Sequence, residues 1–457
     1  MPAIPLAAGG GIVSGRIVRR DAGGAGSRSA ARSGDRSGAE GRNGAGGGQP
    51  GQPGLDFELR VRRGGFALRA AAAVRPGEVL GIIGANGSGK STLLGAISGT
   101  HRIEAGRVVL DGRPLVSRAT GVRGVEVARS GRRIALLDQR SRLFPHLGAR
   151  ANIAFGPRAQ GVPRREADAV AEEWLGRIGL AGRGGAREPQ LSGGQQQRVA
   201  IARALAAGPR ALLLDEPFAA LDVTSRAELR SLVAQELRRL GIPGVIVTHD
   251  PTDLLALADR VLVLEAGEAA QLGTVAEVLD APATPFAAEL TGRVLLAGTA
   301  TGAGTLRPAA APLDELRGVG ELPAPGEPAV ASYPPGELRI APLAPQSGAV
   351  PKSRDRGSAG VWWVGEGEKE KAPTPAPALE AAANREAGGG NPRTNAWTGT
   401  IGAVSAEAAG LRVDCAEWPG AWARLPLSGA PPAWIAPGTR VRFALDPAVV
   451  RFAAPGG

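Results

Sequence analysis

Short apolar runs alternate with longer, more polar segments between residues 55 and 292. Three of the runs, at 79–83, 211–214 and 245–247, are continuous and as long as a strand. Continuous apolar runs separated by helical segments are typical of a mostly parallel sheet with helices on its faces. The pattern therefore predicts an α/β fold for residues 55–292.

Two longer segments, at 164–178 and 195–206, are predicted to be helices within this fold. Near its end, residues 260–264 and 269–272 form two further apolar runs around Ala266-Gly267. Two strands joined through such a short glycine-containing turn predict a closing hairpin.

The rest of the chain differs in composition. Residues 1–54 are mostly Gly, Ala, Ser and Arg, too polar to offset their ordering entropy, so we expect a disordered extension or an upstream start codon chosen in error. Residues 293–344 are interpreted as a connecting segment, and the Pro-, Gly- and charge-rich residues 345–390 as a flexible linker. Short β-like runs separated by Pro-Gly turns return in residues 391–457, which predicts a small all-β domain.

Composition narrows the classes of function. The 457 residues include one cysteine, Cys415, which excludes an intramolecular disulfide framework and a cysteine-based zinc cluster. The formal charge of +11 suggests a nucleic-acid or membrane-surface partner. Much of this excess is Arg scattered through Gly- and Ala-rich segments without interleaved aromatic residues, as a GC-rich codon bias would also produce. We therefore predict no nucleic-acid partner.

The chain contains no apolar run of the roughly 20 residues that a membrane-spanning helix needs. Arg19-Arg20 is followed by Asp21 and a Gly/Ser/Arg tract rather than by the apolar segment of an export signal. We expect a soluble chain that stays inside the cell. If the chain serves transport, separate membrane subunits must form the pore.

The strongest chemical signal is a glycine-rich loop between a predicted strand and a helix-like run. It fits the phosphate-binding pattern GxxxxGK[ST] and consists of Gly84, Ala85, Asn86, Gly87, Ser88, Gly89, Lys90, Ser91 and Thr92. Glycines let backbone amides point at a phosphate chain, and the helix N-terminus adds partial positive charge. We expect Lys90 to contact the β- and γ-phosphates and the Ser91 hydroxyl to bind Mg²⁺.

Two carboxylates follow the apolar run at 211–214. Asp215 would hold the metal through water, and Glu216 would polarise the attacking water beside the γ-phosphate. Two acids at a strand end are otherwise a solvated cap. Their position downstream of a phosphate-binding loop favours the catalytic interpretation.

A third motif, Leu191-Ser-Gly-Gly-Gln195, lies shortly before these carboxylates. With it the chain resembles the ATP-binding cassette (ABC) family, whose signature is LSGGQ, and the resemblance covers residues 55–292. It implies an ATP hydrolase built from a RecA-like core and a helical subdomain, with ATP and Mg²⁺ as ligands.

Three single residues match further motifs of the family in the family's order. The resemblance implies that Gln139 contacts the metal and the attacking water, and that His249 contacts the γ-phosphate. It also implies that Asp222 lies in a loop that crosses to a partner subunit. The aromatic residue that stacks on adenine is not identified by the pattern; Phe66 is the best-placed candidate, and a plain core phenylalanine is the alternative for it.

The resemblance has consequences for assembly. Four signature residues, Ser192, Gly193, Gly194 and Gln195, would complete the nucleotide site of the opposite subunit. Because one phosphate-binding loop and one signature occur here, two chains would sandwich two ATP molecules as a homodimer. Closure of the dimer would drive membrane partners, and hydrolysis would reset them.

Other motifs resemble the importer branch, particularly the molybdate and sulfate uptake ATPases. They are Arg142-Leu-Phe-Pro-His-Leu147 and Asn152-Ile-Ala-Phe-Gly156. Asn395-Ala-Trp-Thr-Gly-Thr-Ile401 resembles the opening of the molybdenum-binding, OB-like β-barrel of the molbindin or TOBE type. A plain structural barrel remains the alternative for this domain.

These resemblances imply an ATPase that energises uptake of molybdate or a similar oxyanion from the cytoplasmic face of the membrane. Its partners would be integral membrane permease subunits and, indirectly, an extracytoplasmic substrate-binding protein. Sulfate, spermidine, iron and sugar uptake remain open as alternatives.

Other classes fit less well. A soluble ABC ATPase that acts on ribosomes usually carries two cassettes, and one that organises DNA carries a long heptad segment, which is missing here. An oxyanion-binding regulator with a vestigial cassette is disfavoured because Lys90, Asp215, Glu216 and His249 are all present.

Overall fold

The computed structural model describes residues 53–454 except 120–123, 140–142, 220, 303, 310–311, 344–394, 408–409, 419, 427–430 and 433. The predicted linker at 345–390 lies outside the described residues, as does all but the end of the predicted extension at 1–54. The described chain comprises an α/β part, residues 53–292, and a β-rich part, residues 293–454, and each is described by itself.

The α/β part contains an 11-stranded sheet in the order β6-β5-β4-β1-β2-β11-β10-β3-β9-β8-β7. The strands are β1 (Leu55–Arg63), β2 (Phe66–Val74), β3 (Val79–Ile83), β4 (Ala105–Leu110), β5 (Arg113–Arg118), β6 (Val125–Glu126), β7 (Ile134–Leu137), β8 (Ala211–Asp215), β9 (Gly244–Val247), β10 (Arg260–Glu265) and β11 (Glu268–Thr274). Strands β10, β3, β9, β8 and β7 pair in parallel. Every residue of β3 and β9 is buried, which explains their continuous apolar sequences.

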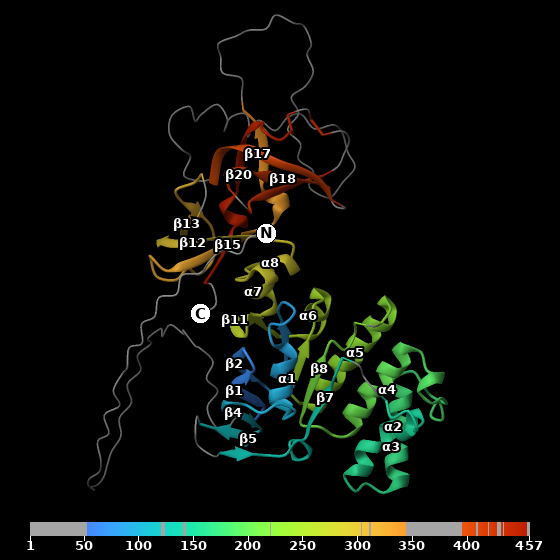
Figure 1. The fold of residues 1–457 in the computed structure, drawn as a ribbon. Helices are drawn as coiled ribbons and strands as arrows, with labels where there is room; N and C mark the ends of the chain where they lie inside the picture. Colours follow the sequence, from blue (N-terminus) through green and yellow to red (C-terminus); the bar gives the residue numbers. More distant parts are fainter. Residues whose placement is uncertain are drawn as a thin grey trace, which may run out of the picture. The chain divides into compact units, whose positions relative to one another are not determined.

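Eight α-helices accompany this sheet in the described part. They are α1 (Lys90–Ser98), α2 (Ala149–Ala159), α3 (Arg164–Arg177), α4 (Gly193–Ala206), α5 (Val223–Leu240), α6 (Pro251–Leu257), α7 (Val275–Asp280) and α8 (Pro285–Leu290). Helices α2, α3 and α4 form a helical cluster of their own (Figure 1), and share a core that includes Ile153, Trp174 and Val199. The expected α/β fold with a helical subdomain is confirmed.

The predicted elements lie close to the observed ones. Helix α4 begins two residues before the predicted 195, because Ser192 caps it by accepting a hydrogen bond from the amide of Gln195. Strands β10 and β11 form the predicted hairpin. Ala266 and Gly267 both have positive φ, 49° and 89°, as a two-residue hairpin turn requires.

The β-rich part contains two five-stranded sheets, in the orders β14-β13-β12-β15-β21 and β16-β20-β17-β18-β19. The strands are β12 (Val294–Gly302), β13 (Thr305–Pro308), β14 (Leu316–Arg317), β15 (Pro328–Tyr333), β16 (Arg339–Pro342), β17 (Asn395–Glu407), β18 (Gly410–Cys415), β19 (Trp422–Leu425), β20 (Arg440–Leu445) and β21 (Arg451–Ala453). The two curled sheets enclose one core, as expected of a small all-β barrel.

Residues 293–344, which the sequence predicted to be a connection, supply five of these strands. Strand β15 pairs with β21, and β16 pairs with β20, so both sheets combine strands from either side of residues 344–394. The apolar signal of the earlier segment is weak because its strands are short and rich in Ala, Gly and Pro. Two of them, β15 and β16, also pair with strands more than a hundred residues further along the chain, where a local pattern gives no indication of them.

Candidate functional site

The phosphate-binding loop connects the end of β3 to the start of α1, as the motif requires. Gly84 and Gly89 have positive φ, 152° and 104°, which side chains with a Cβ rarely adopt. A Cβ at Gly84 would lie 2.2 Å from the carbonyl oxygen of Leu264, and one at Gly89 would lie 2.9 Å from Cζ of Phe66. The fold therefore needs glycine at both positions, and the Phe66 ring packs beside the loop.

Lys90 lies over the loop that it follows. Its Nζ donates hydrogen bonds to the carbonyl oxygens of Gly84 and Ala85, at 2.7 and 2.9 Å. Burial lowers the pKa of Lys90, while the carboxylates of Glu216 and Asp215 raise it. Among the described atoms, the Ser88 Oγ is buried in the same loop without a hydrogen-bond partner. A cradle of this kind, with a cation above it and an unpaired hydroxyl within it, suits a phosphate chain.

The two carboxylates lie at the carboxyl end of β8, next to the loop. Burial raises the pKa of Asp215, and the charge of Glu216 adds to that effect, whereas a hydrogen bond from Ser91 and the charge of Lys90 oppose it. Oxygen donors from one carboxylate and one hydroxyl, together with substrate phosphates, suit Mg²⁺. The residues present therefore fit this ion, because Ser91, Asp215 and Gln139 all offer oxygen donors at this end of the sheet.

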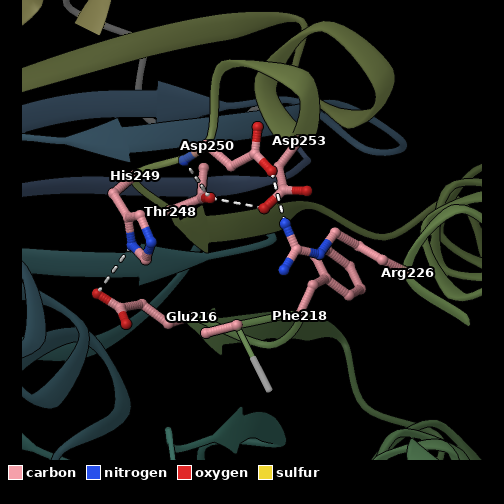
Figure 2. Close-up of a pocket in the computed structure, with 8 residues that line it drawn as sticks. Glu216, Phe218, Arg226, Thr248, His249, Asp250 and Asp253 are labelled. Carbon is pink, nitrogen blue, oxygen red and sulfur yellow. Dashed lines mark hydrogen bonds and ion pairs between the residues drawn. The ribbon is translucent and has the colours of Figure 1, made fainter. Parts of the chain in front are cut away.

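The three residues predicted to be catalytic meet at the ends of neighbouring parallel strands. Gln139 follows β7, Glu216 follows β8, and His249 follows β9. The Gln139 Nε2 donates to a carboxylate oxygen of Glu216 at 3.0 Å, and the His249 Nδ1 lies 3.6 Å from the other oxygen. Figure 2 shows His249 directed at Glu216. The His249 side chain is 64% exposed. Strand order thus places side chains from three distant motifs around one carboxylate.

The signature residues lie apart from this cluster. Ser192 and Gln195 form a reciprocal capping box at the start of α4, and Gly193 is exposed. None of the hydrogen bonds or ion pairs found in the described chain links residues 192–195 to the phosphate-binding loop. Asp222 caps α5 by accepting from the Ser225 amide at 2.9 Å, and this hydrogen bond lowers the pKa of the exposed Asp222 carboxyl. Ser192, Gly193 and Asp222 are thus exposed in this chain and lie outside the cluster around Glu216.

The structure adds residues that the sequence did not single out. A pocket beside Glu216 and His249 is also lined by Arg226, Thr248, Asp250 and Asp253 (Figure 2). Asp250 directly follows His249 and Arg226 lies four residues after Asp222, but their pairing depends on the packing of α5 against α6. Hydrogen bonds from Thr252 and Arg226 outweigh burial and keep the pKa of Asp250 low. Burial raises the pKa of Asp253.

A phosphate-binding loop, two carboxylates at an adjacent strand end and a separate exposed signature define a P-loop nucleotide hydrolase of the cassette type. Residues 69–219 match the protein family described as ABC transporter. The molybdenum import ATP-binding protein ModC of Mycobacterium tuberculosis is 44% identical over 293 residues, which are 63% of this chain and 78% of that protein. The chain therefore belongs to the ABC transporter family, among its import ATP-binding proteins, and is an ATP hydrolase.

Other relatives are named for the import of other substrates. The spermidine/putrescine import protein PotA of Acidothermus cellulolyticus is 41% identical over 48% of this chain and 55% of its own length. The sulfate/thiosulfate import protein CysA of Thermosynechococcus vestitus is 40% identical over 48% of this chain and 63% of its own length. A solved dimeric ATP-binding cassette, MJ0796 bound to ADP and Pi, is 28% identical, with a TM-score of 0.42, over 48% of this chain and 98% of its own.

Proposed function

We propose that this chain energises the uptake of molybdate or a similar oxyanion through separate membrane subunits. The observation that carries the proposal is the set of charged and polar side chains at the ends of β3, β7, β8 and β9, in a chain that resembles ModC over 78% of that protein's length. Relatives named for spermidine/putrescine, Fe(3+) ions and sulfate/thiosulfate share a shorter part of this chain, so these cargoes are alternatives, and sugar uptake stays open as well.

In the proposed reaction, Lys90 exchanges the carbonyl oxygens of Gly84 and Ala85 for phosphate oxygens. Glu216 then orients the attacking water and accepts its proton, while His249 contacts the γ-phosphate. Gln139 would position Glu216 and the water together, because its amide already donates to the Glu216 carboxylate. Bound Mg²⁺ would neutralise charge on the phosphate oxygens, held by Ser91, Asp215 and Gln139.

We propose that two copies of the chain assemble to complete each site. The N-terminus of α4, where Gly193 is exposed, carries partial positive charge, which attracts an anion. Because residues 192–195 have no bond to the phosphate-binding loop of their own described chain, a second copy is the natural source of the phosphate that they would bind.

Integral membrane subunits are the further proposed partners, at the cytoplasmic face, with an extracytoplasmic substrate-binding protein acting through them. No described helix is both long enough and apolar enough to span a bilayer. Phe155 of α2 is 48% exposed and packs against Phe144, with ring centroids 4.6 Å apart. Exposed aromatic surface of this kind suits a protein partner.

The hydrolytic role is tested with Glu216→Gln. The isosteric amide retains the size of the side chain but accepts no proton, so we expect turnover to fall about 100-fold or more while ATP binding persists. With ATP, the variant should accumulate as a dimer in size-exclusion chromatography. Glu228→Gln, on exposed α5 surface, is the matched control, and unchanged turnover in Glu216→Gln would remove this residue from the catalytic role.

The cargo is tested by calorimetric titration of molybdate, tungstate and sulfate into the full chain. The β-rich core spans both segments, so the whole β-rich part must be present. Preferential binding of molybdate and tungstate would support an oxyanion-sensing barrel of the molbindin type. An absence of binding would leave the barrel as a structural domain and the cargo open among the named alternatives.

A further inference from the structure

Two arginines of α5 reach two aspartates at the start of α6, beside His249. The Arg226 Nη1 donates to the Asp250 Oδ2 at 2.9 Å, and the Arg230 Nε lies 3.2 Å from the Asp253 Oδ1. Arg226 and Arg230 are four residues apart, so they share one face of α5. We call these two contacts the α5–α6 ion pairs, and Figure 2 shows the one between Arg226 and Asp250 at the pocket.

The α5–α6 ion pairs hold the backbone on both sides of His249. Asp250, which follows His249, is held by Arg226 and also caps α6 through the amide of Thr252. Thr248, which precedes His249, donates to the Asp253 Oδ2 at 2.7 Å and accepts from the Asp250 amide at 3.1 Å. The position of the exposed His249 ring therefore depends on α5, although no hydrogen bond or ion pair within the described chain joins α5 to the ring.

Arg226 also holds the segment in front of its own helix. Its Nη2 donates to the carbonyl oxygen of Leu221 at 3.4 Å. Leu221 directly precedes Asp222, the exposed cap of α5. One guanidinium thus joins the segment that carries Asp222 to the segment that carries His249.

The stability of the fold alone is a weak explanation for the position of the Arg226 guanidinium. The Nε of Arg226 is buried and has no hydrogen-bond partner within the described part of the chain. A buried unpaired N–H costs free energy, so the guanidinium is placed for its two loop contacts rather than for full hydrogen bonding.

We propose that Arg226 is a positioning residue for ATP hydrolysis, which couples the Leu221–Asp222 segment to His249 through Asp250. The inference rests on the proposed function, in which Asp222 faces a second copy of the chain. When the copies pair around ATP, a shift of Leu221 and Asp222 reaches Arg226 and, through Asp250, the loop of His249. The γ-phosphate contact of His249 then forms in step with pairing.

The test uses the full chain with Arg226→Gln, with Asp250→Asn and with both changes. Asn preserves the size and the capping ability of Asp250 while it removes the charge that Arg226 binds. We expect each single variant to lose about tenfold in kcat. The KM for ATP and the affinity for a fluorescent ATP analogue should stay within about twofold of the unmodified chain. The double variant should be no slower than either single variant, because one contact is broken in all three.

Glu228→Gln is the matched control, because Glu228 lies on α5 and pairs with Arg198 at 2.6 Å without contacting Leu221 or Asp250. It should keep the kcat of the unmodified chain. Normal kcat in Asp250→Asn would overturn the proposal, as would independent losses that multiply to about 100-fold in the double variant. If Arg226→Gln fails to fold, Asp250→Asn decides alone. An unmodified chain that does not hydrolyse ATP would instead contradict the proposed function.

Discussion

Glu216 has an unfavourable backbone conformation at its place in the site. Its φ of 48° lies in the left-handed region, which is unfavourable for a residue with a Cβ. The Glu216 amide donates to the carbonyl oxygen of Val247 at 3.0 Å, and its carboxylate accepts from Gln139. These contacts hold the backbone so that the carboxylate faces Gln139 and His249. Strain at this residue is thus linked to the geometry of the site.

Replacing Glu216 by glycine should therefore relieve strain while it removes catalysis. We expect Glu216→Gly to be more stable than Glu216→Ala by about 1 kcal/mol, because glycine adopts positive φ without a steric cost. Both variants lack the carboxylate, so the comparison isolates the backbone. Urea denaturation of the two variants measures the difference, and equal midpoints would show that the backbone at 216 relaxes at no cost.

Residues in contiguous motifs could be placed from the sequence. The phosphate-binding loop, Asp215 and Glu216 were predicted because each motif lies directly at the end of an apolar strand. Arg226 and Asp250 were not, because 24 residues separate them and an Arg or Asp at a helix start is usually a cap or a solvated charge. Only the packing of α5 on α6 makes them a pair.

At the scale of elements, α1 depends on a residue outside the phosphate-binding motif. Arg132 is 4% exposed, and its guanidinium donates to the carbonyl oxygens of Ala96 and Ile97 in the last turn of α1. It also donates to the carbonyl oxygen of Val127. A cation at a helix C-terminus satisfies carbonyls that have no partner within the helix and interacts well with its dipole. The helix that begins at Lys90 is thereby held at its other end.

Arg132→Met should destabilise the α/β part by about 3 kcal/mol, because it leaves buried carbonyl oxygens without a donor. Arg133→Met is the control. Arg133 is exposed and adjacent, so its replacement should change the unfolding free energy by less than about 0.5 kcal/mol. Thermal and urea denaturation compare the two. Equal stabilities would mean that water replaces the Arg132 guanidinium at the end of α1.

Elements with a strong local pattern were predicted well. Strands β3, β8 and β9 are buried on both faces and read as continuous apolar runs. The strands β12 to β16 were missed, since much of the core that they cover comes from residues 395–452 and since β15 and β16 pair with strands of that distant segment. The presence of a β domain was predictable, but its extent was not.

At the scale of the whole molecule, the β-rich part is one unit made of two separated segments. Its single core includes Leu296 and Tyr333 from the first segment and Trp397, Phe443 and Phe452 from the second. Apolar residues of either segment lose their covering when the other is missing. The domain boundary relevant to stability therefore lies near residue 293 and not near 391.

Two truncations test this boundary. A chain that ends at residue 292 should stay monodisperse and should retain the ability to bind ATP, because the α/β part has its own cores. A chain that ends at residue 343 should aggregate, because it exposes half of the β-rich core and unpaired strand edges. Size-exclusion chromatography compares the two, and equally good behaviour would show that the first segment is stable by itself.

The pairing of β21 with β15 also bears on how the protein is made. Residues 451–453 complete a sheet whose other strands end at 333, so the β-rich part closes only after the ribosome has added residue 453. At roughly 5–20 residues per second, the first segment waits on the order of 5–20 s for its partner strands. The ATPase half has all of its residues by then and can fold first. The nascent β segment is thus the stretch that a chaperone would have to shield during synthesis.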